Sequence, residues 1–385
     1  MIKPNPLVMI PGPTPIARSV MEQLGRETIS YNDLRFSVEF KGLIEDMKSL
    51  WRCEDGMVFI AGGSGTMAME MGISNTASRG ERVLVCSNGF FGDRYVNICE
   101  RKGFDLDVIR AEWGKTVTTE EIEAHLAKRP SSVVVVTHVE TSTGVEFPLR
   151  EAASMIRAGH PDTLLVVDGV ASVGGAEFYM DWGIDIMLTC SQKCLGAPPG
   201  LGAVWASPRA IQKRESMPTI AESYVDFVQW IPVMKDTMKY WGTPAVNMVW
   251  ALREGVRLIK EEGIPERDRR HRLYAEAVRR AMGALGFKHK APIELASPTV
   301  TVFLYPDEGI DDAAFRAAVY DEGAQIAPCQ GQFLGKGFRI GHMGNITPST
   351  IVSLIAAVER GCVRQGIKIE LGSALAEAQR VLTGV

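Results

Sequence analysis

Several short stretches of the chain are apolar without interruption, and each one ends in glycine or polar residues. They comprise residues 57–60, 82–86, 133–137, 164–168 and 202–205. None alternates between apolar and polar positions, so these strands are predicted to be buried on both faces, as in a mainly parallel sheet covered by helices. Helical patterns lie between them, which predicts an α/β large domain. Ligands in such sheets bind beyond the carboxyl ends of the strands, where the polar residues fall.

The pattern changes after residue 263. A long helix is predicted over 246–261, and Gly263 and Pro265 are predicted to end it. A charged helix over 268–282 follows, then a strand over 299–304, a helix over 311–320, a short strand over 338–340 and a helix over 349–362 capped by Thr347. We therefore expect an N-terminal segment over residues 1–18, a large domain over 19–263 and a smaller α+β domain over 264–385.

Composition narrows the class of protein. The chain has 385 residues, of which 46% are hydrophobic and 23% charged, as is usual for a globular protein. A net charge of −4 gives no reason to expect a nucleic acid or a membrane surface as partner. No apolar stretch approaches the roughly 20 residues of a membrane span. The seven cysteines are scattered without a CxxC pair, which favours reduced thiols and a cytoplasmic location.

Two ionisable residues follow neighbouring predicted strands. Asp168 ends the strand over 164–168, and Lys193 follows a further short apolar run, also predicted as a strand, that precedes the one over 202–205. A carboxylate and an amine at neighbouring strand ends are able to hold the two ends of pyridoxal phosphate, the amine at its aldehyde and the carboxylate at its ring nitrogen. Taken singly, Asp168 could be a helix cap or a ribose-binding acid, and Lys193 a surface lysine. Together they indicate a pyridoxal-phosphate enzyme.

Other segments carry matching chemistry. The turn over 62–66 lies between a strand and a helix, and its free N–H groups and hydroxyls suit a phosphate, although alone it is equally typical of a plain turn. Phe91 could stack on a planar ring, but a phenylalanine after a strand is more often in the core. Arg339, between apolar residues and glycines, suits either a substrate carboxylate or an internal salt bridge. No HExxH or zinc-type spacing occurs, so no metal is predicted.

These motifs together resemble the class V aminotransferases of fold type I, and most closely the alanine or serine–glyoxylate (pyruvate) enzymes. The resemblance runs along nearly the whole chain. It rests on the segments 11–14, 64–66, 88–92, 140–144, 168–172, 191–193, 240–243 and 339–341.

The resemblance assigns a role to each of these residues. Lys193 is expected to form the Schiff base and Asp168 to pair with the ring nitrogen. Phe91 and Val170 are expected to cover the two ring faces, although the family often has tryptophan in place of Phe91. Ser64, Gly65, Thr66 and Gln192 are expected to hold the phosphate and Thr141 to lie near the ring oxygen. Arg339 is expected to bind the substrate carboxylate, with Gly12 of the N-terminal segment close by. Separately, Tyr31 lies in a loop, over residues 30–35, that is expected to contact the substrate side chain. Tyr240 and Thr243 are expected to reach the cofactor of a neighbouring subunit, which implies a homodimer with shared active sites.

The expected activity is transamination with ping-pong kinetics. A small amino acid, alanine or serine, passes its amino group to glyoxylate or pyruvate. Lys193, once freed, is expected to act as the general base, while the ring nitrogen paired with Asp168 absorbs developing charge.

Several alternatives stay open. Aspartate and ureidoglycine–glyoxylate aminotransferases are related, although no second arginine for a side-chain carboxylate is obvious. Pyridoxamine–pyruvate aminotransferase is also similar, but the intact Ser64-Gly65-Thr66 favours a resident phosphorylated cofactor. A cysteine desulfurase is disfavoured because Gln192, not histidine, precedes the lysine, although Cys329 lies near Arg339. A non-catalytic regulator or nucleotide-binding protein is disfavoured because mere binding needs no carboxylate-reading arginine. The roles of Cys194 and His342 are left undetermined.

Overall fold

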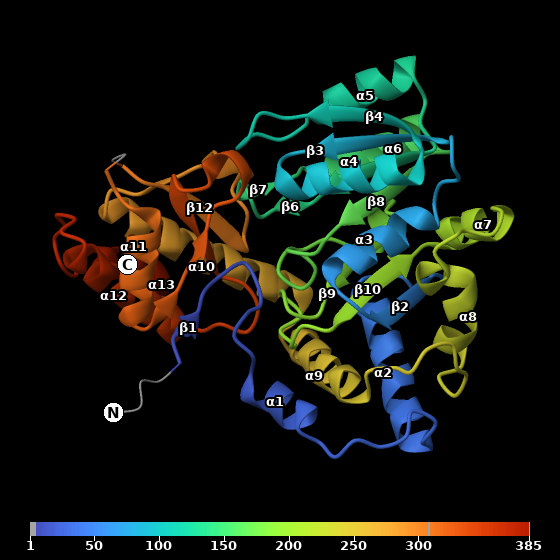
Figure 1. Cartoon of the computed structure of the whole chain (residues 1–385), viewed down its shortest axis with the longest axis horizontal. Coiled ribbons are helices and arrows are strands. Elements are labelled where there is room, and N and C mark those ends of the chain that lie inside the picture. The colour runs from blue at the N-terminus through green and yellow to red at the C-terminus, as the bar shows by residue number, and fades with distance from the viewer. Residues whose placement is uncertain (1–4, 307–308, 385) are drawn as a thin grey trace.

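The computed structural model describes residues 5–306 and 309–384. A large sheet with its helices occupies the right of Figure 1, and a smaller region formed by the C-terminal part of the chain lies at the left.

The large sheet has seven strands among the described residues, in the order β2-β10-β9-β8-β5-β3-β4. Their bounds are β2 Met57–Gly62, β3 Arg82–Ser87, β4 Asp105–Arg110, β5 Val133–Thr137, β8 Leu164–Asp168, β9 Ile186–Cys190 and β10 Leu201–Ala206. Strands β9, β8, β5, β3 and β4 run parallel, and β10 is antiparallel to both β9 and β2. Since β2 therefore points the same way as β9, the carboxyl ends of six strands share one edge. The mainly parallel α/β sheet predicted from the sequence is confirmed.

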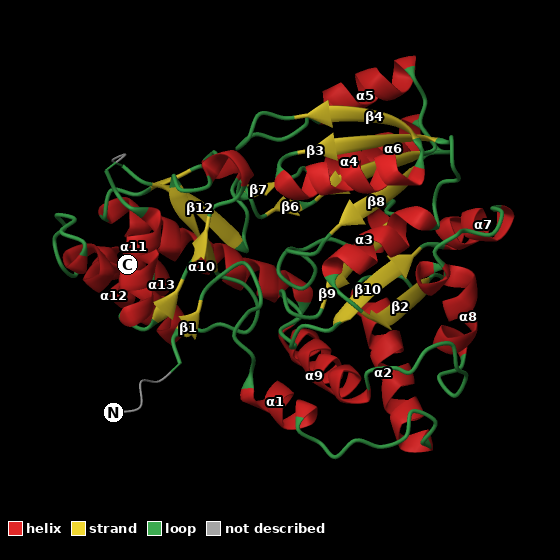
Figure 2. Cartoon of the chain, viewed as in Figure 1, coloured by secondary structure: helices red, strands yellow, loops and turns green. Residues whose placement is uncertain are grey.

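Helices cover the large sheet on both faces (Figure 2). They are α1 Arg18–Leu24, α2 Leu34–Leu50, α3 Gly65–Ser74, α4 Phe90–Lys102, α5 Thr119–Lys128, α6 Leu149–Gly159, α7 Pro208–Ser216, α8 Phe227–Lys235 and α9 Val246–Glu262. Every residue of β5, β8, β9 and β10 is buried, which explains their uninterrupted apolar sequences. Strand β4 lies at the edge and alternates polar with apolar residues, so a search for continuous apolar runs misses it.

The C-terminal region has a four-stranded sheet with its own core. Its strands are β11 Lys288–His289, β12 Val300–Leu304, β15 Gly337–Gly341 and β14 Ala327–Pro328, in that order. Helices α10 Ile264–Ala284, α11 Asp312–Asp321, α12 Pro348–Arg364 and α13 Ser373–Thr383 pack with it. Short two-residue strands β6 Val139–Glu140 and β7 Val145–Glu146 pair beside the large sheet.

One boundary differs from the sequence-based expectation. Gly263 caps α10 as well as ending α9, and Pro265 lies in the first turn of α10 rather than in a break between helices. Proline is tolerated in a first turn because its missing N–H has no helical partner there. Helix α10 therefore begins four residues before the predicted 268.

The N-terminal segment joins the C-terminal region before it reaches the large sheet. Strand β1 (Leu7–Val8) pairs in parallel with β13 (Ala324–Gln325), and Gly341 N donates to Met9 O. Residues 1–4 of the predicted segment lie outside the described residues. No helix in the described ranges is long and apolar enough to cross a membrane.

Candidate active site

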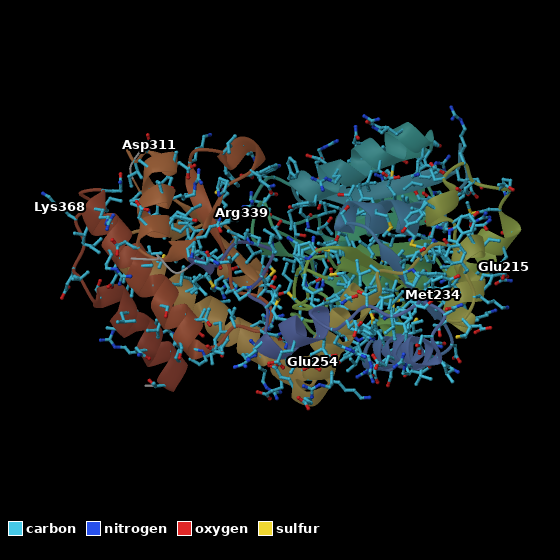
Figure 3. The ribbon with its side chains drawn as sticks, turned by 60° about the horizontal axis from the view of Figure 1, so that its bottom comes forward. Glu215, Met234, Glu254, Asp311, Arg339 and Lys368 are labelled. Atoms are coloured by element: carbon cyan, nitrogen blue, oxygen red, sulfur yellow. The ribbon has the colours of Figure 1, made fainter. Side chains whose placement is uncertain are left out.

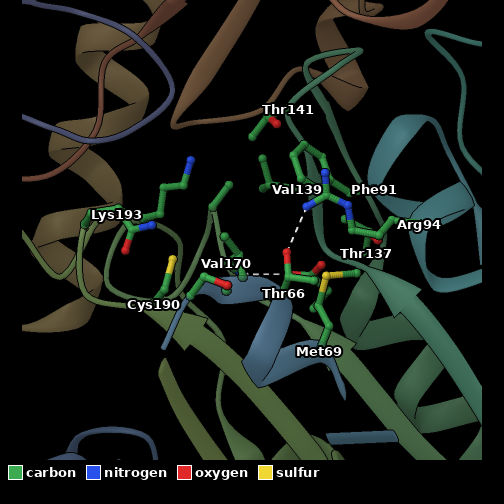
Figure 4. Close-up of a pocket in the computed structure, with 15 residues that line it drawn as sticks. Thr66, Met69, Phe91, Arg94, Thr137, Val139, Thr141, Val170, Cys190 and Lys193 are labelled. Carbon is green, nitrogen blue, oxygen red and sulfur yellow. Dashed lines mark hydrogen bonds between the residues drawn. The ribbon is translucent and has the colours of Figure 1, made fainter. Parts of the chain in front are cut away.

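A cavity of about 190 Å³ lies at the carboxyl edge of the large sheet (Figure 4). Its lining comprises Ser64, Gly65, Thr66, Met69, Phe91, Arg94, Thr137, Val139, Thr141, Asp168, Val170, Ala171, Cys190, Gln192 and Lys193. Nine of these were predicted as site residues. They come from segments more than 120 residues apart, which the strand order brings to one edge.

Asp168, the last residue of β8, is the buried acid of the cavity. Its Oδ1 accepts a hydrogen bond from Val170 N at 2.9 Å. Burial raises the pKa of Asp168 to about 7, and the bond from Val170 and the charges of Arg94 and Lys193 only partly oppose this rise. A cation placed beside this carboxyl would restore its charged form.

Lys193 follows β9 by three residues, so its amine enters the cavity from the neighbouring strand end. Its Nζ donates to Pro11 O of the N-terminal segment. Burial lowers the pKa of Lys193. Gly12 lies directly against this side chain: a Cβ there would come within 2.4 Å of Lys193 Cδ, and its φ of +87° also favours glycine. Gly12, predicted to lie near the substrate, therefore packs directly on the Lys193 side chain.

The turn between β2 and α3 also lines the cavity. Ser64 is the N-cap of α3, and its Oγ accepts from Met67 N at 3.4 Å. The N–H groups of a first helical turn have no helical partner and carry partial positive charge. Together with the hydroxyls of Ser64 and Thr66, they form a donor set suited to an anion.

Phe91 borders the cavity because Glu140 holds the start of α4. The carboxylate of Glu140 accepts from Phe91 N at 2.9 Å, Gly92 N at 3.2 Å, and both N and Oγ of Ser142. All four partners are donors, so a carboxylate suits this position and an amide would bring N–H against N–H. Along the sequence Glu140 stands out only as part of a motif, because its partners Phe91 and Gly92 lie about 50 residues away.

Arg339, in the middle of β15, belongs to the C-terminal region and lies on its side nearest the large sheet (Figure 3). It is 7% exposed. Its Nε donates to Pro328 O at 2.8 Å, and its Nη1 donates to Thr141 O at 3.2 Å and Gln330 Oε1 at 3.0 Å. The guanidinium is thus tied to Thr141 of the cavity wall, while Nη2 has no hydrogen-bond partner among the described residues. An internal salt bridge, the alternative for this arginine, is not formed within those residues.

Five predicted residues are not in the lining of the cavity: Gly12 and Arg339, which contact lining residues, and Tyr31, Tyr240 and Thr243. Tyr31 packs on Tyr240, with ring centroids 5.1 Å apart, and Tyr240 Oη lies 3.3 Å from Thr243 Oγ1. Tyr240 is 59% exposed. Within one chain Tyr31, Tyr240 and Thr243 contact each other rather than the cavity.

His138, directly after β5, and His342 are buried hydrogen-bonding groups. His138 Nδ1 lies 3.0 Å from Ser172 Oγ, and His342 lies between Thr301 Oγ1 and Pro298 O, both at 2.9 Å. Burial lowers the pKa of each to about 3, so both are neutral. No group of three or more metal-ligating side chains gathers anywhere in the described part of the chain.

The cavity fits pyridoxal phosphate in each of its chemical parts. The donor set at α3 suits a phosphate, Asp168 a protonated ring nitrogen, Lys193 an aldehyde, and Phe91 and Val170 the ring faces. Two lining residues also carry buried oxygen atoms with no partner in the structure, Gln192 Oε1 and Thr137 Oγ1. Buried polar atoms normally have partners, so both oxygens are available to a polar group placed in the cavity.

The family follows from comparison with known proteins. The family model described as "Aminotransferase class-V" matches residues 35–319 of this chain. The serine–glyoxylate aminotransferase of Methylorubrum extorquens is 34% identical over 97% of this chain and 95% of that protein. The L-aspartate–glyoxylate aminotransferase of Paracoccus denitrificans is 33% identical over 98% and 96% respectively. The crystal structure of ureidoglycine–glyoxylate aminotransferase from Bacillus subtilis superimposes with a TM-score of 0.93 at 28% identity, covering 100% of this chain and 99% of that one.

This chain belongs to the class V aminotransferase family. It is therefore a transaminase with the fold of the pyridoxal-phosphate enzymes of type I, and the resemblance to serine and alanine–glyoxylate aminotransferases predicted from the sequence is confirmed.

Proposed function

We propose that the chain is a pyridoxal-phosphate-dependent aminotransferase that moves the amino group of alanine or serine to glyoxylate or pyruvate. The observation that carries the proposal is the cavity in which Asp168 and Lys193 meet the helix start at Ser64. Bound pyridoxal phosphate supplies an aldehyde that condenses with amines and a ring that accepts electrons, which transamination requires.

The residues of the chain supply the proton transfer. Burial lowers the pKa of Lys193, which favours the neutral amine that a general base requires. The same amine gives up its bond to Pro11 O when it acts on a ligand in the cavity. Gly12 leaves room for this movement because any larger residue would occupy the space of the lysine side chain.

Arg339 is proposed to bind the substrate carboxylate. Its Nε and Nη1 are fixed by protein oxygens, and Nη2 is left to donate. A guanidinium held in this way loses little rotamer freedom on binding. Ping-pong kinetics follow because one site handles both the amino acid and the keto acid.

The position of Cys329 argues against a cysteine desulfurase, which needs a reactive thiol. That thiol is 1% exposed, and burial raises its pKa to about 12. A buried, protonated thiol is a poor nucleophile.

A homodimer with shared sites is part of the proposal. Large apolar side chains are exposed on the start of α2 and on residues 224–240, namely Leu34, Val38, Tyr224, Val228, Met238 and Tyr240. The two segments contact each other through Ser37 and Thr237, and Tyr224 Oη donates to Gly62 O, at the start of the turn over 62–66 that is proposed to bind the phosphate. An exposed apolar surface that reaches this turn supports the proposal that a second copy of the chain binds there. Tyr240 and Thr243 would then face the partner's cavity.

We also propose the boundaries 1–18, 19–263 and 264–385 for the segment and domains, and a cytoplasmic location. The location is supported by the seven cysteines, none of which forms a disulfide.

The test is spectroscopic. Cofactor-free protein is mixed with pyridoxal phosphate, and the visible absorption band of the lysine-bound cofactor is followed. We expect the band in the wild type and its loss in Lys193→Ala, with transamination reduced by about 10⁴-fold or more. Lys213→Ala serves as the control, because Lys213 pairs with Glu81 at the surface. A persisting band in Lys193→Ala would refute the assignment.

The donor is identified by a screen with the same band. Each amino acid is added alone, and loss of the band reports the first half-reaction. We expect alanine or serine to react fastest. If aspartate reacts fastest instead, aspartate is the amino donor and the proposed donors are wrong.

A further inference from the structure

The predicted phosphate seat carries no cationic side chain of its own. Ser64, Gly65, Thr66 and Gln192 are neutral, and a helix N-terminus contributes about half a positive charge. A phosphate monoester carries about −1.5 to −2 at neutral pH. A cation beside a partly enclosed anion of this charge stabilises it further, because the helix start and the neutral donors leave much of its charge uncompensated.

Two cationic side chains line the cavity, Arg94 and Lys193. They enter it from opposite sides in Figure 4. Lys193 is engaged with Pro11 O and is assigned to the aldehyde. Arg94 is therefore the cation that remains for the phosphate.

Arg94 lies on α4, three residues and about one helical turn after Phe91. Its Nη1 donates to Thr66 Oγ1 at 3.0 Å, and its guanidinium carbon lies 4.8 Å from the centroid of the Phe91 ring. The nearby cations Arg110 and Lys102 pair with Asp93 and Glu222. Arg94 forms no ion pair within the described residues, so its charge is available to a ligand.

The bond to Thr66 also orients a second donor. The hydroxyl oxygen of Thr66 accepts from the guanidinium, which leaves its own hydrogen free to donate. A hydroxyl that accepts from a cation is a stronger donor to an anion, because each bond polarises the next.

We propose that Arg94 binds the cofactor phosphate, through its own guanidinium and through the Thr66 hydroxyl that it orients. This inference rests on the proposed function. A dicarboxylic substrate would be the other anion for a second guanidinium, but Arg94 is bonded to the helix start at the seat, whereas Arg339 is bonded to Thr141. The position at the seat favours the phosphate.

The experiment compares two ligands that differ only in the phosphate. Cofactor-free wild type, Arg94→Met, Arg94→Lys and the control Arg110→Met are titrated with pyridoxal phosphate and with pyridoxal, following absorbance. We expect Arg94→Met to weaken pyridoxal phosphate binding by about 10- to 100-fold and to change pyridoxal binding by less than about twofold. Arg94→Lys is expected to recover part of the loss, and Arg110→Met to match the wild type.

A second measurement needs no cofactor. Inorganic phosphate is added to the cofactor-free proteins, and the thermal midpoint is recorded. The wild type and Arg110→Met are expected to be stabilised, and Arg94→Met is expected not to be. This readout also shows whether Arg94→Met is folded.

The results separate the possible roles of Arg94. An equal loss for pyridoxal phosphate and pyridoxal would overturn the proposal and make Arg94 a support for the ring pocket. Unchanged binding of both, with a raised KM for aspartate alone, would assign the guanidinium to a substrate carboxylate instead. If the wild type itself forms no Lys193-dependent band, the proposed function fails, and the phosphate measurement still decides whether Arg94 binds this anion.

Discussion

The sheet edge and the exposed surface around Tyr240 differ in how completely one chain builds them. At the carboxyl edge of the large sheet, Asp168 and Lys193 are held by hydrogen bonds within the chain and line a cavity. Around Tyr240, the side chains contact each other and face outward, with Tyr240 59% exposed. In the first region a single chain supplies the lysine and the acid proposed for the chemistry. The second has the composition of an interface, and its predicted role requires a partner.

Replacing Asp168 tests the first region with the largest expected effect. Asp168→Asn keeps the shape and the acceptor for Val170 N but removes the charge that would pair with a protonated ring. We expect kcat/KM to fall by about 10³-fold, in line with the loss of one charge-stabilising group in an enclosed site. Asp185→Asn is the matched control, since Asp185 is also buried but precedes β9, away from the cavity. A similar loss of activity in both variants would contradict the role of Asp168.

The same substitution has a pH-dependent effect on the stability of the cofactor-free protein. The pKa of Asp168 is raised from 3.8 to about 7, so the folded state retains a proton that the unfolded chain loses. The wild type therefore loses stability as pH rises from about 4 to about 7. Asp168→Asn lacks this loss, and we expect its unfolding free energy to exceed the wild type's by about 4 kcal/mol at pH 8, but not at pH 4. Denaturant unfolding at the two pH values measures the difference.

Replacing Arg339 tests whether the C-terminal region contributes to substrate binding through this one guanidinium. Arg339→Met removes the guanidinium that Thr141 O, Pro328 O and Gln330 hold in place. We expect kcat/KM for the amino acid to fall by about 10²-fold, mainly through KM, because a charged pair with the carboxylate is lost. Cofactor binding is expected to be unchanged. Arg316→Met is the control, since Arg316 pairs with Asp312 on α11; a rise in KM of the same size there would deny Arg339 its role.

The smallest direct effect is expected at the exposed surface. The double variant Tyr240→Phe, Thr243→Val removes two hydroxyls, and we expect cofactor affinity to fall by about tenfold. Its sharper test is mixing with Lys193→Ala under cofactor-limiting conditions. If sites are shared, mixed dimers contain one intact site each, and a random mixture recovers about a quarter of wild-type activity. No recovery, in a mixture shown to exchange subunits, would place both residues outside the partner's site.

The sequence predicted the large sheet well because its strands are continuous apolar runs, and such runs are buried whatever surrounds them. It missed β4, whose sequence alternates at the sheet edge, and it placed the start of α10 too late because Pro265 is compatible with a first turn. The two ionisable residues were predictable for a related reason, since parallel strands bring their carboxyl ends to one edge.

The sequence alone determined local properties: which segments are buried, and which chemical groups follow them. Only the tertiary structure decided which groups meet. Glu140 holds the start of α4 from about 50 residues away, and Arg94 reaches Thr66 across 28 residues. Neither contact leaves a pattern along the chain, because hydrogen bonds between side chains depend on distance and direction in space. The sequence indicated the lysine and its acid; the fold added the carboxylate and the guanidinium that hold their surroundings.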